Sequence, residues 1–240
     1  MRAEIVQRLI EINHIFYRDF ATEFSGSRYA AWDGFAPLAA HLPDPCSRFL
    51  DVGCGEGRLG RYLLEADRVQ EYIGVDFSEG LIAEARARAA KDTFFVRNLV
   101  APDALAGFGR FQGIASIAVL HHIPGYENRL RLVREMAAHL EPDGRLIVSG
   151  FQFLNSERLR RKLLDWSVEG VDSAELEPKD YLMDWKRGGN GTRYLALIDH
   201  AEKEKLAHDA GLTIVDQYSM DGKEGNLNLY TVLAASPTNA

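Results

Sequence analysis

The chain contains little cysteine and no long apolar run. Its 240 residues include 2 cysteines, Cys46 and Cys54, which form neither a disulfide framework nor a metal-binding pattern. A reducing environment, and hence a cytoplasmic protein, is therefore expected. No apolar stretch is long enough to cross a bilayer and no secretory segment is recognisable, so we expect no association with a membrane.

Basic residues are in the minority. Lys and Arg number 28 against 35 Asp and Glu, which gives a formal net charge of −7 at pH 7. This balance argues against a globally basic nucleic-acid binder but leaves a local basic face possible. The hydrophobic content of 46% is that of an ordinary globular protein, and the length suits one large α/β domain. We therefore expect a single domain over residues 1–240.

The most informative stretch is FLDVGCGEG, from Phe49 to Gly57. It predicts a buried strand that stops in a glycine-rich turn and leads into a helix near Arg58. A second apolar run, residues 72–75, ends in another acid, Asp76. Strand, glycine turn, helix and a strand closing on an acid are typical of the nucleotide-binding half of a doubly wound sheet. In that arrangement Asp76 is positioned to accept hydrogen bonds from two ribose hydroxyls.

The glycine pattern by itself does not identify the cofactor. The spacing Gly55-x-Gly57-x-x-Gly60 matches the dinucleotide fingerprint, which is a weak signal when it stands alone. Asp51, just before the glycines, favours a ligand with an ammonium and a sulfonium group and would repel a pyrophosphate. An NAD(P)-dependent oxidoreductase and a non-catalytic cofactor-binding scaffold remain as remote alternatives.

The rest of the chain predicts helices and strands in alternation around a parallel sheet. Helices are expected over 3–22, 31–42, 58–67, 79–91, 126–141 and 199–210. Strands are expected near 49–52 and over 71–76, 94–96, 111–119, 145–151, 212–219 and 226–235. The predicted fold is α/β: a doubly wound, Rossmann-like seven-stranded sheet, with N-terminal helices (1–45) covering one side of the ligand cleft.

Residues 152–192 interrupt this alternation. A basic helical stretch is expected up to Trp166, followed by a polar loop and the flexible Gly188–Gly191. We interpret the segment as an insert that forms a lid over the cleft, because forty structureless residues would be unusual. Its basic residues form either a solvated face or a surface for an anionic polymer. They are Arg158, Arg160, Arg161, Lys186 and Arg187.

Two adjacent histidines, His121 and His122, follow the fourth predicted strand. They lie at the carboxyl edge of the sheet, where doubly wound folds bind ligands. No further Cys, His or acid stands at ligand spacing nearby, so no metal site is predicted. A role for one histidine toward the substrate and a structural role for both are left open.

Four segments together resemble the class I S-adenosylmethionine-dependent methyltransferases, and more narrowly the tRNA wobble-uridine carboxymethyl methyltransferases. The segments are Phe24-Ser25-Gly26-Ser27-Arg28 with Trp32; Asp51 to Gly57; Ser116 to His122; and Trp185-Lys186-Arg187 with Arg193-Tyr194, followed by Glu202, Leu206 and Gly211. That family converts a carboxymethyl group to its methyl ester. The resemblance implies this fold, S-adenosylmethionine as cofactor and a tRNA as partner, with a small-molecule acceptor as the alternative; it leaves the need for an activator subunit open.

The resemblance also implies the site residues. Cofactor-binding residues would be Asp51, Gly53, Cys54, Gly55, Gly57, Asp76, Phe77, Asn98, Leu99, Ser116 and Ala118. Asn98 stands where the family usually has an acid, although its amide oxygen can accept the same hydrogen bond. The catalytic set would be Arg28, His122, Arg193 and Tyr194. Two of its members, Arg28 and Arg193, would hold the carboxylate at the mouth of the cleft.

Overall fold

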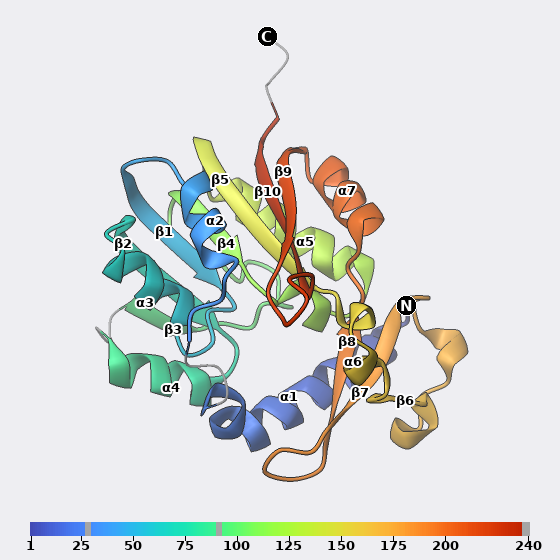
Figure 1. The fold of residues 1–240 in the computed structure, drawn as a ribbon. Coiled ribbons are helices and arrows are strands. Elements are labelled where there is room, and N and C mark those ends of the chain that lie inside the picture. Colours follow the sequence, from blue (N-terminus) through green and yellow to red (C-terminus); the bar gives the residue numbers. More distant parts are fainter. Residues whose placement is uncertain (27–29, 90–92, 237–240) are drawn as a thin grey trace.

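The structure, a computed structural model, describes residues 1–26, 30–89 and 93–236 (Figure 1). At its centre is a seven-stranded sheet with the strand order β3-β2-β1-β4-β5-β10-β9. The strands are β1 (Cys46–Val52), β2 (Val69–Asp76), β3 (Phe94–Val96), β4 (Phe111–Ser116), β5 (Leu140–Phe151), β9 (Leu212–Met220) and β10 (Asn228–Ala235). β1 to β5 pair in parallel, and β10 pairs antiparallel with both β5 and β9. The predicted seven-stranded α/β sheet is confirmed.

Helices cover both faces of the sheet (Figure 1). They are α1 (Ala3–Gly26), α2 (Phe35–His41), α3 (Arg58–Glu65), α4 (Glu79–Arg88), α5 (Tyr126–Ala138) and α7 (His200–Asp209). Helices α4 and α7 each begin at a residue whose side chain caps the helix. The Ser78 hydroxyl accepts from the Leu81 N–H, and the Asp199 carboxylate accepts from the Glu202 N–H. Both caps satisfy amide groups that the first helical turn leaves without partners.

The central strands β1, β4 and β10 are buried on both faces because helices lie on both sides. Neighbouring residues of β1 show this: Leu50 belongs to the core under α5 and α7, and Phe49 belongs to the core under α2 and α3. This alternation is the reason that the strands read as continuous apolar runs in the sequence. No helix among the described residues is both long enough and apolar enough to cross a membrane.

Two boundaries differ from prediction for identifiable reasons. α2 begins at Phe35, since the preceding residues form a turn in which the Gly34 N–H donates to the Asp221 carboxylate at 2.9 Å. β4 ends at Ser116, three residues early, because Ala118 adopts a left-handed backbone with φ of 60°. A strand cannot continue through that conformation.

The insert differs most from its prediction. The basic helix is a single turn, α6 (Glu157–Arg160), and not a helix up to Trp166. The chain then forms β6 (Leu163–Leu164), which pairs antiparallel with β7 (Asp180–Trp185), which in turn pairs with β8 (Gly191–Ala196). Leu163 and Leu164 gain cross-strand partners in this way, and their apolar contacts outweigh the helical propensity of the basic stretch.

A buried arginine connects the insert to two of the helices that cover the main sheet. Arg129 of α5 is 2% exposed. Its guanidinium donates to Glu177, just before β7, at 2.7 Å, to Glu202 of α7 at 2.6 Å, and to the Ile123 carbonyl at 3.0 Å. One cation therefore connects three segments that are far apart in the sequence.

We predict that Arg129→Ala destabilises the protein by about 3–5 kcal/mol, because two carboxylates lose their shared cation. Urea unfolding followed by circular dichroism measures this loss. Arg134→Ala is the matched control on the same helix, since Arg134 is exposed and its side chain bonds, within the described part of the chain, only the Asp209 carbonyl. It should cost about 1 kcal/mol or less. Equal losses in the two variants would contradict the role assigned to Arg129.

Candidate active site

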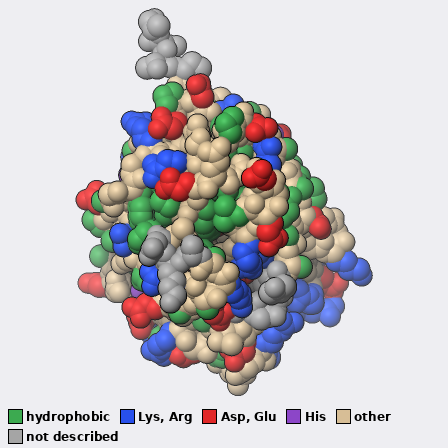
Figure 2. Space-filling model, turned by 90° about the vertical axis from the view of Figure 1, so that its left-hand side faces the viewer, with side chains coloured by type: hydrophobic (Ala, Val, Ile, Leu, Met, Phe, Trp, Pro, Cys, Tyr) green, Lys and Arg blue, Asp and Glu red, His purple; other side chains and the backbone are tan. Residues whose placement is uncertain are grey.

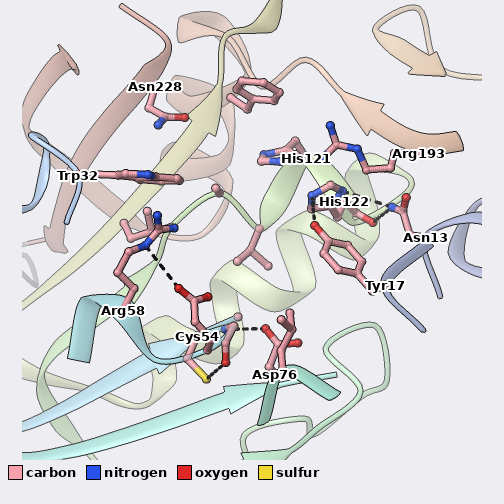
Figure 3. Close-up of a pocket in the computed structure, with 18 of the residues that line it drawn as sticks. Asn13, Tyr17, Trp32, Cys54, Arg58, Asp76, His121, His122, Arg193 and Asn228 are labelled. Atoms are coloured by element: carbon pink, nitrogen blue, oxygen red, sulfur yellow. Dashed lines mark hydrogen bonds and ion pairs between the residues drawn. The ribbon is translucent and has the colours of Figure 1, made fainter. Parts of the chain in front are cut away.

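A cavity of about 650 Å³ opens at the carboxyl ends of β1, β2 and β4 (Figure 3). The glycine turn after β1 forms one end of it. α1, the turn before α2 and the β7–β8 hairpin of the insert form the other end. The position is that of the ligand site in doubly wound sheets, where the strand order reverses.

Asp76, at the end of β2, is held by backbone amides. Its two carboxylate oxygens accept hydrogen bonds from the Gly55 and Ser78 N–H groups, each at 2.9 Å. Burial raises the pKa of this carboxyl to about 6, although the same amide donors oppose the shift. A ligand that brings hydroxyl donors or positive charge to this position would favour the ionised form.

Asp51, at the end of β1, is the second buried acid. The Tyr72 hydroxyl donates to it at 2.8 Å. Burial raises the pKa of the Asp51 carboxyl to about 7, and the negative charge of Asp76 adds to the rise. Burial raises the pKa of both carboxyls at this end of the cavity, so a cationic ligand beside them would favour their ionised forms.

The glycines of the turn have different roles. A Cβ at Gly53 would meet a Val119 methyl at 2.1 Å, and one at Gly57 would meet the Phe94 ring at 2.9 Å. Glycine is needed at these two positions because a side chain would collide with the neighbouring residues. A Cβ at Gly55 would have only Leu81 within reach, at 4.0 Å. Gly55 therefore presents bare backbone to the cavity, as a closely bound ligand requires. This open backbone and the two acids fit a cofactor with ribose hydroxyls and cationic groups.

At the other end, α1 and the insert meet across one side chain. The Asn13 amide accepts from the Tyr194 N–H at 3.0 Å and donates to the Tyr194 carbonyl at 3.2 Å, so it pairs with the edge of β8 as a neighbouring strand would. One turn further along α1, the Tyr17 hydroxyl lies 2.9 Å from His122 Nε2. His122 Nδ1 lies 3.3 Å from the Tyr194 carbonyl. The Asn13 Nδ2 donor also lies 3.4 Å from Nδ1, but it is closer to the Tyr194 carbonyl, at 3.2 Å. Because that carbonyl only accepts, we infer that Nδ1 carries the proton and that Tyr17 donates to Nε2.

Arg193 supplies a buried cation beside this group. It is 5% exposed, and its guanidinium carbon lies 5.0 Å from the Phe16 ring centroid and 5.3 Å from that of Trp185. Burial lowers the pKa of the guanidinium, and the nearby Tyr17 hydroxyl opposes the shift. Figure 3 shows Arg193 beside His122 and Asn13, across the cavity from Asp76.

Most of the predicted site residues line this cavity. They are Asp51, Gly53, Cys54, Gly55, Asp76, Phe77, Asn98, Leu99, Ala118, His122 and Arg193. Three of the predicted site residues that the structure describes do not line the cavity. Gly57 packs on Phe94, and Ser116 is fully buried within β4. Tyr194 is also fully buried, with its hydroxyl donating to Asp180 at 2.7 Å, so it belongs to the core and not to the reacting groups. Arg28 lies outside the described residues.

Sequence reasoning missed several lining residues, among them Asn13, Tyr17, Trp32 and Asn228. A signal for the first pair was present, since Asn13 and Tyr17 are polar residues four apart on a helix whose surrounding stripe is apolar. Asn228 had no such signal, because it enters the cavity from the start of a strand remote in the sequence. Among the described residues, no group of three or more His, Cys, Asp or Glu side chains is placed to hold a metal ion.

Comparison with known proteins agrees with this site. A family model described as a methyltransferase domain matches residues 50–146, which contain both acids and the glycine turn. The chain is a class I S-adenosylmethionine-dependent methyltransferase. Among solved structures, it resembles an S-adenosylmethionine-dependent methyltransferase from Clostridium acetobutylicum, with a TM-score of 0.65, 14% identity, and coverage of 95% of this chain and 98% of that one.

Curated relatives extend the comparison beyond the fold. A putative methyltransferase of Encephalitozoon cuniculi is 26% identical over 85% of this chain and 88% of its own length. The probable tRNA methyltransferase 9B of Bos taurus is 32% identical over 81% of this chain but only 38% of its own length. The tRNA (carboxymethyluridine(34)-5-O)-methyltransferase of Xenopus tropicalis is 31% identical over 58% of this chain and 20% of its own. The chain thus spans less than half of these two tRNA methyltransferases.

We predict that Gly55→Val weakens binding of S-adenosylmethionine by roughly 10- to 100-fold, the cost of forcing a side chain into an occupied space. Isothermal titration calorimetry measures the affinity. Gly170→Val is the matched control, because Gly170 has a similar positive φ, 65° against 55°, and a Cβ there would meet no described heavy atom within 4 Å. Both variants carry the same backbone strain, so a loss of affinity shared by both would show that Gly55 serves only the turn.

The raised pKa values of Asp51 and Asp76 predict that cofactor affinity depends on pH. Below their pKa values of about 7 and about 6, Asp51 and Asp76 are protonated and attract a cationic ligand less, so affinity for S-adenosylmethionine should rise from about pH 5 to pH 7.5. Stability of the unliganded protein should change in the opposite sense. A carboxyl whose pKa is raised by folding contributes stability that is present below its unfolded pKa and is lost as the pH rises through its folded pKa.

Asp51→Asn removes the higher of these two titrations and should flatten the affinity profile, as measured by calorimetry across the pH series. Asp143→Asn, at an exposed position, should leave the profile unchanged. A profile that is already flat in the wild type would mean that neither acid titrates on cofactor binding.

Proposed function

We propose that this methyltransferase esterifies a carboxylate, the carboxymethyl group of a tRNA wobble uridine. The Xenopus tropicalis relative, 31% identical over 138 residues, is named for that activity. The observation that carries the proposal is the division of charge within the cavity. The cofactor end is lined by Asp51, Glu56 and Asp76, with Arg58 paired to Glu56. In the rest of the lining basic residues outnumber acids: Arg158, Lys162, Lys186, Arg187 and Arg193 against Asp33 and Asp221.

Arg193 is the residue proposed to hold the carboxylate. A guanidinium binds a carboxylate through two parallel hydrogen bonds, and the interaction strengthens where water is excluded. Stacking against Phe16 and Trp185 limits the motion of this guanidinium before any ligand arrives. The Arg193 guanidinium is therefore preorganised to bind a planar anion.

The reaction requires alignment more than acid–base chemistry. When bound, S-adenosylmethionine supplies an electrophilic methyl group. A carboxylate is already ionised at neutral pH, so the chain needs no general base to activate it. Arg193 would orient the acceptor, and the aromatic walls of Tyr17, Trp185 and Phe77 would exclude water. His122, held by Tyr17 and the Tyr194 carbonyl, would act as a fixed wall and not as the proton acceptor.

A tRNA partner is supported by the local concentration of positive charge. The cavity is lined on the insert side by Arg158, Lys162, Lys186 and Arg187. Nearby, Arg160 at the end of α6 and Arg161 directly after it are exposed. Figure 2, which views the molecule from the left-hand side of Figure 1, shows Lys and Arg side chains gathered at its lower right. Such a surface attracts a phosphate backbone even on a chain with a net charge of −7. The overall acidity favours the second candidate, a small carboxylate acceptor.

The test is methyl transfer from radiolabelled S-adenosylmethionine to tRNA that carries carboxymethyluridine, followed by mild alkali. An ester releases labelled methanol, whereas N-methyl and ether products do not. Transfer that requires the carboxymethyl group and gives an alkali-labile product supports the proposal. A stable product, or equal transfer to tRNA without the carboxymethyl group, overturns it; transfer only to small carboxylates favours the second candidate.

We predict that Arg193→Lys weakens acceptor binding by about 10-fold or more while affinity for S-adenosylmethionine stays unchanged. Lysine keeps the charge but loses the second of two parallel charged hydrogen bonds. Steady-state kinetics with each substrate varied separates the two effects, and Arg134→Lys, on the exposed face of α5, is the control. A loss confined to cofactor affinity would remove Arg193 from the acceptor site.

A further inference from the structure

We propose that Trp32 and Asn228 form a subsite for a flat, hydrogen-bond-donating ring, which is the base that carries the carboxylate. Both residues line the cavity, one from the turn before α2 and one from the start of β10. The inference rests on the proposed nucleic-acid acceptor and adds a base-recognition element to it. Neither the glycine motif nor the basic residues of the insert take part in this subsite.

The Asn228 amide has a fixed orientation and an unused acceptor. Its side chain is 3% exposed, and its Nδ2 donates to the Asp221 carboxylate at 2.9 Å. Because a carboxylate only accepts, the nitrogen must face Asp221 and the oxygen must face away from it. That oxygen is buried and has no hydrogen-bond partner among the described residues. A buried acceptor without a partner is costly, and an N–H group from a ligand would remove the cost.

Trp32 offers an aromatic surface beside this acceptor. The Arg58 guanidinium carbon lies 4.4 Å from the centroid of the Trp32 ring and covers one face. Figure 3 shows Arg58 and Asn228 on opposite sides of the indole. Since Trp32 lines the cavity, we infer that, among the described residues, its face toward Asn228 is open to it. A base that stacks on this face gains a sequence-tolerant contact that any flat ring can make.

Asp221 holds the two halves of the subsite together. Besides Asn228 it accepts from the Gly34 N–H at 2.9 Å, two residues after Trp32, and from the Tyr230 hydroxyl at 2.7 Å. It does so with a left-handed backbone, at φ of 68°. Strained conformations of this kind persist where the surrounding structure fixes them, and they concentrate at ligand sites. The subsite is therefore preorganised and does not depend on a mobile side chain.

The chemistry of the two residues selects the ligand. An acceptor beside an aromatic face suits a ring with an N–H on its edge, and uracil presents one at N3. The N3–H and the C5 substituent lie on different edges of that ring. A uracil bound through N3–H can therefore direct a C5 carboxymethyl group away from Asn228 and toward the reacting end of the cavity.

The experiment compares two anticodon stem-loops, one with carboxymethyluridine and one with its N3-methylated form, by kcat/KM and by equilibrium binding. Wild type should prefer the N3–H form by about 10-fold, the value of one hydrogen bond. Asn228→Ala should lose this preference, with little further effect of N3-methylation. Asn226→Ala, an exposed neighbour outside the cavity, should keep it. Trp32→Leu should weaken both stem-loops, whereas Trp32→Phe, which keeps a flat ring, should restore most of the loss.

The outcomes separate the two proposals. Equal binding of both stem-loops by the wild type overturns the subsite, whether or not methyl transfer occurs. Selective binding without methyl transfer retains the subsite and overturns the esterification. If Asn228→Ala does not fold, the wild-type comparison of the two stem-loops still decides, because it requires no variant.

Discussion

The pairing of Asn13 with the backbone of Tyr194 sets the register between α1 and the insert. β8 is the edge strand of its small sheet, and an exposed edge has N–H and C=O groups without partners. One asparagine amide satisfies both groups of Tyr194 at once. Arg193 precedes Tyr194 in the chain and Tyr17 follows Asn13 by one helical turn. A shift of this contact by one residue would therefore separate the buried cation from the aromatic wall that holds it.

The cavity combines two electrostatic environments that would conflict if they overlapped. The acids at the ends of β1 and β2 attract a cation, and the arginines and lysines of the insert attract an anion. The carboxyl ends of the strands position the acids, and the insert positions the arginines and lysines. The Arg129 ion pairs connect these two parts of the protein, so the distance between the charge clusters depends on a contact that lies outside the cavity. For the proposed anionic acceptor, methyl transfer from a cationic donor would use this separation, since each substrate would bind its own end.

The sequence was sufficient to predict the sheet, and nine of the eleven residues expected to bind the cofactor line the cavity. Both depend on local patterns: apolar runs that end in acids, and glycines at a turn. The end proposed to bind the acceptor was harder to predict, because it is assembled from α1, the insert and the start of β10. Tyr194 illustrates the difficulty, since it adjoins Arg193 in sequence and yet, on the opposite face of β8, points into the core. The insert was misjudged for a related reason. Its basic residues favour a helix, but pairing of Leu163 and Leu164 with β7 is a tertiary effect that no local window contains.

Two non-glycine residues at the cavity wall, Ala118 and Asp221, have a left-handed backbone conformation. Ala118 ends β4 in that conformation, and its N–H donates to the Ser149 hydroxyl at 2.9 Å. The turn that results carries the chain across the cavity from Val119 to His122 instead of extending the strand. Asp221 has the same conformation on the opposite side and holds Asn228. At Ala118 a conformation that costs of the order of 1–3 kcal/mol turns the chain out of the strand and into the site, whereas at Asp221 it places a carboxylate that orients Asn228 at the start of β10. A β4 that continued as an ideal strand would be more stable locally, but it would not bring His122 to the cavity wall.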